Sequence, residues 1–84
     1  MTDEQRQQLR DRIGLRVATL RKMRGWSQQE LADRAGLQRT HVGRIEAGKY
    51  AVTLETIQAI AEALDMSVDI IDPRLEGLAP MKTL

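Results

Sequence analysis

The sequence predicts an all-α protein built from five short helices, and three observations lead to this fold class. Apolar residues recur at spacings of three and four in several windows, which is the period of one helix face. No window alternates strictly between apolar and polar residues, and no Asn-Gly or Asp-Gly pair marks a hairpin. Capping patterns and glycines bracket the apolar windows, so they also locate the helix ends.

The first helix is predicted to begin near Asp3, where Thr2 and Gln5 form a capping box. It should end at Gly25, after a basic last turn. Residues 1–12 are mostly polar, so we treat them as an N-terminal extension of this helix. The apolar face consists of Leu9, Ile13, Val17 and Leu20.

The second and third helices form the pattern of a helix-turn-helix between residues 28 and 47. Ser27 and Glu30 make a second capping box before the first of the two. A small residue at Ala32 lets two helices cross closely, and Gly36 can adopt the left-handed conformation that a three-residue turn needs. The next helix is held against the rest by Leu37, Val42 and Ile45, and it stops at Gly48.

Two further helices complete the domain, which should span residues 1–72. Thr53 caps the fourth helix, whose buried face is predicted to consist of Leu54, Ile57, Ile60, Ala61 and Leu64. Ser67 caps a short fifth helix, which Asp72-Pro73 closes. Residues 73–84 have mixed polarity and no clear period, so we expect a tail that is mobile or ordered only by a partner.

Composition and charge narrow the class of protein. The 84 residues suit one domain, and the lack of cysteine excludes disulfides and fits a reducing cytoplasm. No apolar run approaches the roughly 18 residues of a membrane span, so we expect a soluble cytoplasmic protein. Residues 1–50 contain 11 Lys or Arg and 6 Asp or Glu, whereas residues 51–84 contain 2 and 6. The basic part suggests a surface that faces a polyanion.

A family resemblance covers roughly residues 13–71. The segments that carry it are LR at 20–21, SQQELA at 27–32, AG at 35–36, RIEAGK at 44–49 and LDMSVDII at 64–71. In them the chain resembles the Cro/repressor-type, or XRE-like, helix-turn-helix family of bacteria and phages. The resemblance implies a five-helix, lambda-repressor-like DNA-binding domain, in which the second helix crosses the DNA backbone and the third enters the major groove.

The resemblance also implies roles for individual positions. Gln28 would contact phosphate or the edge of the site, and Lys49 would lie near the DNA backbone. Arg21 and Glu46 would form a structural pair that joins the first helix to the third. The exposed face of the reading helix would present Gln38, Arg39, Thr40, Gly43 and Arg44.

Helix geometry gives the same exposed face independently. On a helix that starts near Gln38, positions 39, 40, 43, 44 and 47 lie opposite Val42 and Ile45. Arginine can form two hydrogen bonds with guanine, and such a pair gives roughly 1–3 kcal/mol of discrimination between bases. We therefore expect DNA contacts from Arg39 and Arg44, although both could instead be solvated surface residues.

Other positions on this face also leave alternatives open. Thr40 could contact a base methyl or phosphate, or be an ordinary helix residue. His41 could contact DNA or act as a packed or exposed spacer. Gln38 is a poor helix cap, so either the helix begins loosely or Gln38 is kept for a contact. Gly43 costs up to ~1 kcal/mol relative to alanine, and we expect it to mark a close approach to the groove.

No catalytic or metal-binding arrangement is present in the sequence. The single histidine, His41, lacks the companion residues of a metal site or an acid–base pair. No Ser/His/Asp arrangement emerges either. We predict that the protein is not an enzyme and uses no cofactor or metal.

The sequence therefore predicts a sequence-specific, double-stranded DNA-binding transcriptional regulator, a repressor that occludes a promoter. One recognition helix reads only a few base pairs, so we expect a homodimer on a palindromic operator with half-sites roughly 34 Å apart. An apolar dimer patch could consist of Ile70, Leu75 and Leu78, unless Ile70 only covers the core.

Two alternative functions remain open at this point. An antitoxin of the same fold would bind DNA and also grip a toxin protein through the acidic residues 51–84. A protein-interaction adaptor could have kept the fold and lost DNA binding. The arginines and the lysine around the reading helix argue against the adaptor, and a toxin reading frame beside the gene would favour the antitoxin.

Overall fold

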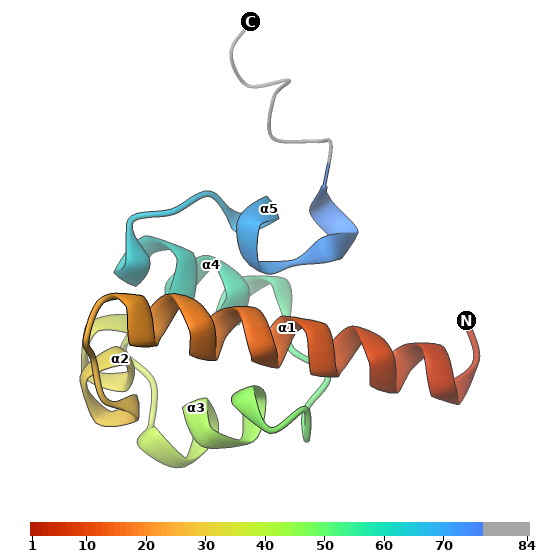
Figure 1. Ribbon diagram of the computed structural model, residues 1–84, viewed down its shortest axis with the longest axis horizontal. Helices are drawn as coiled ribbons and strands as arrows, with labels where there is room; N and C mark the ends of the chain where they lie inside the picture. The colour runs from red at the N-terminus through yellow and green to blue at the C-terminus, as the bar shows by residue number, and fades with distance from the viewer. Residues whose placement is uncertain (77–84) are drawn as a thin grey trace, which may run out of the picture.

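The structure, a computed structural model, describes residues 1–76, which form five α-helices and no strand (Figure 1). The predicted all-α fold class is confirmed. The helices are α1 (Asp3–Met23), α2 (Gln28–Ala35), α3 (Arg39–Glu46), α4 (Leu54–Leu64) and α5 (Val68–Ile71), and a 3-10 turn at Pro73–Leu75 follows them. In this part of the chain no helix has the length and apolar character needed to cross a bilayer.

Two helices begin at the predicted capping boxes. At α1 the Gln5 N–H donates to Thr2 Oγ1 at 3.1 Å, and the Thr2 N–H donates to Gln5 Oε1 at 2.8 Å. At α2, Ser27 and Glu30 exchange the same two bonds at 3.1 and 3.2 Å. Each box satisfies N–H groups that the start of a helix otherwise leaves without a partner. Both capping boxes are thereby confirmed.

The turn between α2 and α3 depends on Gly36. This residue has a φ of 70°, the left-handed conformation that was predicted for it. The Leu37 N–H donates back to the carbonyl of Ala32 at 2.8 Å, which closes the turn. Ala32 is itself fully buried, so a small side chain stands where the two helices pack together.

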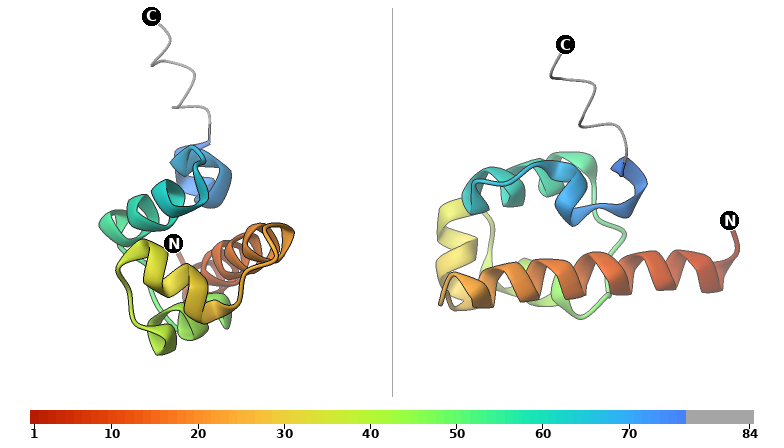
Figure 2. Two further views of the ribbon diagram at one scale, coloured as in Figure 1. Left: turned by 90° about the vertical axis from the view of Figure 1, so that its left-hand side faces the viewer. Right: turned by 45° about the horizontal axis from the view of Figure 1, so that its top comes forward.

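The helices pack around one core, and α1 crosses the front of the molecule in the view of Figure 1. On one side α1 packs against α3, and on the other against α4 and α5, while α2 joins α3 to α4 at the end of the bundle (Figures 1 and 2). The buried apolar residues are Ile13, Val17, Leu31, Ala32, Val42, Ile45, Val52, Ile57, Ile60, Ala61, Leu64 and Ile71. Most of the predicted helix faces therefore meet in this core.

The prediction that Leu54 lies on the buried face of α4 is wrong. Leu54 is 56% exposed, whereas Ile57 is fully buried. Leu54 is the first residue of α4, so its spacing fits the apolar face but its position lies at the edge of the bundle. The core of this helix begins one turn later.

Packed structure continues past the predicted domain end at residue 72. The Asp72 carboxylate is almost completely buried and accepts hydrogen bonds from Arg74 Nε at 2.9 and 3.0 Å. Burial alone would raise the pKa of Asp72, but the hydrogen bonds from Arg74 outweigh it and lower that pKa. Arg16 binds Glu76 at 2.9 Å, which ties the 3-10 turn to α1. Residues 77–84 lie outside the described residues.

α1 comes very close to the end of α3 at Gly14, a residue to which the sequence alone gave no role. Gly14 is buried in α1 against the end of α3. A Cβ atom at this position would lie 2.7 Å from the carbonyl oxygen of Glu46, and nearer still to that of Ile45. Since both neighbours are backbone atoms, they cannot move aside as a side chain would. Gly14 therefore sets the distance between α1 and α3.

We expect the substitution Gly14→Ala to destabilise the fold although alanine favours helix. The added methyl group must push α3 away from α1, and overpacking of this kind lowers the free energy of unfolding by roughly 1–3 kcal/mol. Urea unfolding followed by circular dichroism measures the change. The matched control is Gly43→Ala in α3, where the nearest atom to a new Cβ is the flexible Gln28 Oε1 at 3.5 Å. Equal stabilities of the two variants would contradict the close approach.

Candidate nucleic-acid interface

The exposed face of α3 is polar and lies opposite its core contacts. Val42 and Ile45 are fully buried, which fixes the rotation of the helix about its axis. Several of the predicted DNA-contacting residues are exposed, namely Gln38, Arg39, Thr40, Arg44 and Lys49. His41, Gly43 and Gln28 are half-buried. The predicted face is therefore presented to solvent as one continuous side of the helix-turn-helix.

A buried ion pair holds α3 against α1. Arg21 Nε donates to Glu46 Oε2 at 2.7 Å, and its NH2 group donates to Glu46 Oε1 at 3.0 Å. The two side chains are only 10% and 8% exposed. A third bond runs from Arg21 NH1 to the Trp26 carbonyl at 2.7 Å, so the turn after α1 is held as well. The hydrogen bonds with Glu46 raise the pKa of Arg21 above its usual value, which keeps this cation charged.

Gln28 connects this buried pair to the surface. Its Nε2 donates to Glu46 Oε1 at 3.1 Å, and its Oε1 accepts from Arg39 NH1 at 3.2 Å. The amide therefore bridges α2 and α3. It also lies beside Gly43, since a Cβ there would be 3.5 Å from Gln28 Oε1. The structure thus brings three predicted contact residues, Gln28, Arg39 and Gly43, into one group.

A second group forms around Tyr50, which the sequence analysis treated only as part of a connector. The Tyr50 hydroxyl accepts a hydrogen bond from Arg44 NH1 at 2.9 Å. The His41 ring packs edge-on against the Tyr50 ring, with 5.2 Å between the centroids. The sequence offered one signal for this group, an aromatic residue directly after Lys49, but that signal did not indicate which residues it contacts. Without the structure, nothing showed that the chain returns to α3 there.

The Gln38 side chain does not cap the start of α3. Gln38 is the N-cap residue with φ −83° and ψ 146°, but its side chain forms no capping hydrogen bond. This is consistent with the expectation that glutamine is a poor cap. The first turn of α3 therefore has no side-chain cap, and the exposed Gln38 side chain lies at its start. Such a helix start attracts anions.

The electrostatics of this face favour a polyanion. Among residues 1–76, no carboxylate lies within ion-pair distance of Arg39, Arg44 or Lys49, and the five ion pairs found there all involve other arginines. In the same part of the chain, no three His, Cys, Asp or Glu side chains lie close enough to hold a metal ion. What the face offers chemically is hydrogen-bond donors and positive charge.

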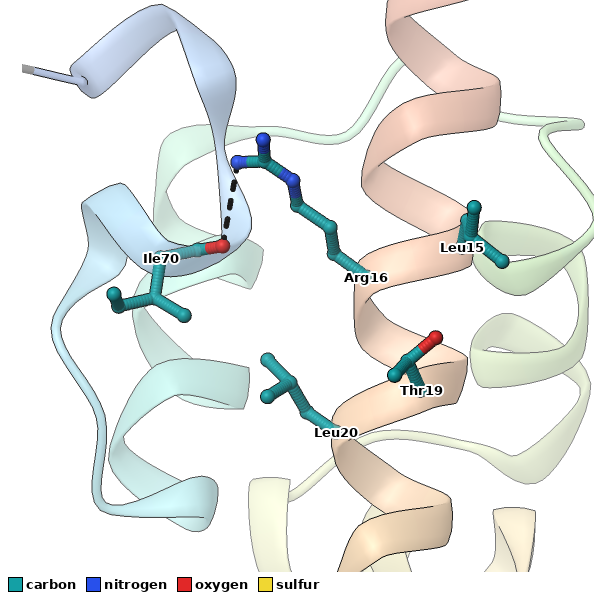
Figure 3. Close-up of a pocket in the computed structure, with 5 residues that line it drawn as sticks. All are labelled: Leu15, Arg16, Thr19, Leu20 and Ile70. Atoms are coloured by element: carbon teal, nitrogen blue, oxygen red, sulfur yellow. Dashed lines mark hydrogen bonds between the residues drawn. The ribbon is translucent and has the colours of Figure 1, made fainter.

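The predicted dimer residues lie on another side of the molecule. Ile70 is 46% exposed, Leu75 is half-buried, and Leu78 lies outside the described residues. Ile70 borders a hollow of about 310 Å³ between α5 and α1, together with Leu15, Arg16, Thr19 and Leu20 (Figure 3). Leu15, which is 68% exposed, was not predicted as part of this patch. It was missed because the pairing of α1 with α5 is a tertiary contact.

Comparisons with known proteins identify the family to which the chain belongs. A helix-turn-helix family model matches residues 17–71. The immunity repressor protein of Bacillus phage phi105 is 37% identical over 59 residues, and control protein C.SmaI of Serratia marcescens is 40% identical over 52. These matches cover 70% and 62% of this chain. The chain spans only 41% and 62% of the length of those two relatives.

A solved structure shows the same fold in a relative. The restriction-modification controller protein C.AhdI from Aeromonas hydrophila matches with a TM-score of 0.72 and 37% identity, over 74% of this chain and 94% of that one. The matched family model covers both helices of the predicted motif and all of the buried core except Ile13. The resemblance to the Cro/repressor type is confirmed, and the chain belongs to the helix-turn-helix family.

Proposed function

We propose that the protein is a sequence-specific, double-stranded DNA-binding transcriptional regulator that acts as a repressor in the cytoplasm. The observation that carries this proposal is the exposed face of α3. There Arg39 and Arg44, with Lys49 just beyond the helix, carry positive charge without a carboxylate partner in residues 1–76. Val42 and Ile45, on the opposite face, anchor the helix in the core. A rigid helix with such a face fits the major groove.

The names of similar proteins support a role in the regulation of transcription. They include the immunity repressor of phage phi105, the competence pilus inhibition repressor of Acinetobacter baylyi and the controller C.AhdI. A small domain that covers a promoter would repress transcription by excluding polymerase.

We assign different tasks to the cations of this face. Arg44 and Arg39 lie on α3 itself, where a guanidinium can reach the O6 and N7 atoms of guanine. Lys49 lies beyond the end of α3, where a flexible ammonium suits a phosphate. Gln28, Gln38 and Thr40 add polar groups around the helix start. Sequence preference would then come mainly from the two arginines, and affinity for any duplex from all the cations.

Selection of bound duplexes from a random pool tests this function. The expected result is one enriched palindromic sequence, bound with an affinity that falls steeply as salt rises. The same experiment yields the operator and the spacing of its half-sites. A purified protein that showed no salt-sensitive duplex binding at low ionic strength would refute the proposal.

Two single substitutions separate base reading from phosphate binding on the selected duplex. Arg44→Ala should relax the preference for one base pair by about 1–3 kcal/mol, because a bidentate contact is lost. Lys49→Ala should weaken binding to all duplexes alike and reduce the salt slope by about one. Fluorescence anisotropy titrations at several salt concentrations measure both effects. Identical behaviour of the two variants would mean that the tasks are not divided in this way.

Gly43→Ala tests the close approach of α3 to the groove. Alanine should raise the free energy of unfolding by up to ~1 kcal/mol, because it favours helix and its methyl group has room beside Gln28. Affinity for the operator should nevertheless fall several-fold, since the methyl group occupies space between helix and groove. Thermal unfolding and duplex titration measure the two effects. An unchanged affinity together with raised stability would show that no close approach is needed.

We further propose that the protein binds its operator as a homodimer through the α1–α5 face. Ile70 and Leu15 are large apolar side chains that border one hollow and are both exposed (Figure 3). A two-fold axis through this face would place the same residues of a second copy against them, which is the self-complementary contact of symmetric dimers. A palindromic site has the same symmetry.

Ile70→Lys should disrupt this dimer, because two lysines would meet across the axis. Sedimentation velocity should then show a monomer, and affinity for the full palindrome should fall while affinity for an isolated half-site stays the same. Leu54→Lys is the matched control, since Leu54 is a similarly exposed apolar residue on α4. A wild-type monomer, or a dimer in the Ile70 variant, would argue against this interface.

A further inference from the structure

Tyr50 makes a bridge between two side chains on the exposed side of α3. Arg44 NH1 donates to the Tyr50 hydroxyl at 2.9 Å, and the guanidinium carbon lies 5.8 Å from the centroid of the ring. His41, one helical turn before Arg44, packs edge-on against the same ring at an interplanar angle of 81°. The aromatic ring is therefore in contact with α3 at two successive turns.

The connector after α3 holds Tyr50 in this position. Gly48 has a φ of 72°, the left-handed conformation with which the chain turns away from the helix. Val52, two residues beyond Tyr50, is buried in the core, and its carbonyl accepts a bond from Arg74 at 3.3 Å. The ring is thus anchored through the backbone on one side and by His41 on the other. A ring held in this way can orient a flexible neighbour.

The contact with Tyr50 leaves Arg44 able to read a base. A guanidinium has five N–H donors, of which the tyrosine hydroxyl takes one, whereas a bidentate bond to guanine needs two. A phenol hydroxyl, unlike a carboxylate, does not compete with DNA for the cation by forming an ion pair. The hydroxyl restricts the direction of the side chain without neutralising it.

We propose that Tyr50 is a positioning residue for Arg44, so that preference at the base pair read by Arg44 depends on the Tyr50 hydroxyl. This inference rests on the proposed function. A free arginine must lose many rotamers when it binds, and that loss weakens binding by about two- to tenfold per side chain. Tyr50 orders Arg44 in the free protein, which removes part of this loss in the complex.

A double-mutant cycle tests the proposal on the selected operator and on a duplex with the Arg44-contacted base pair replaced. Tyr50→Phe keeps the ring against His41 and removes only the hydroxyl. It should lower the ratio of the affinity for the selected operator to the affinity for the altered duplex by about two- to tenfold. The unfolding midpoint should stay unchanged. In the Arg44→Ala background the same change should have no effect on that ratio. Met23→Ala, at an exposed apolar side chain near the end of α1, is the control and should leave the ratio as it is.

Two results would overturn the positioning role. One is an unchanged ratio in Tyr50→Phe, with neither duplex affected or with an equal loss for both, where an equal loss would make the hydroxyl an independent phosphate contact. The other is an effect on the ratio that persists in the Arg44→Ala background. Either result leaves the proposed function intact if the wild-type protein still prefers its operator. Absence of duplex binding by the wild-type protein would instead contradict both the proposed function and the positioning role.

Discussion

The position of α3 depends on the buried ion pair between Arg21 and Glu46. Two charges removed from water destabilise a fold unless their hydrogen bonds are nearly complete. Here the guanidinium binds both carboxylate oxygens and the Trp26 carbonyl, and the carboxylate also accepts from Gln28. The arrangement that satisfies these groups fixes α1, the turn after it, α2 and α3 together. Gly14 makes it possible, because only a residue without a side chain lets α1 reach the end of α3.

The same network continues from the core to the surface. Glu46 orients Gln28, and Gln28 in turn accepts a bond from Arg39. At the other end of α3, Arg44 is held by Tyr50. Both arginines on the exposed face are therefore ordered by neutral partners in the free protein. Ordering before binding reduces the entropy lost in the complex, so the interior of the domain contributes to the properties of its surface.

The segment around α3 is basic, whereas the segment from α4 to Glu76 is acidic. Arg39, Arg44 and Lys49, which have no carboxylate partner among residues 1–76, are on α3 and just beyond it, whereas α4 and α5 lie on the other side of α1 (Figure 1). Part of the acidic charge is used internally, since Asp72 binds Arg74 and Glu76 binds Arg16. These two ion pairs neutralise part of the negative charge of the acidic segment.

The sequence by itself determined the features that depend on neighbouring residues. Capping boxes, the turn at Gly36 and the helical spacing of the core residues follow from local hydrogen bonding and periodicity, and they predicted the fold and the exposed face of α3. Tertiary structure decided the rest. It placed Tyr50 on Arg44, Leu15 and Ile70 around one hollow, Gly14 against the end of α3 and Leu54 at the edge of the bundle. These contacts join residues whose distance in space is set by helix packing, which no local pattern encodes.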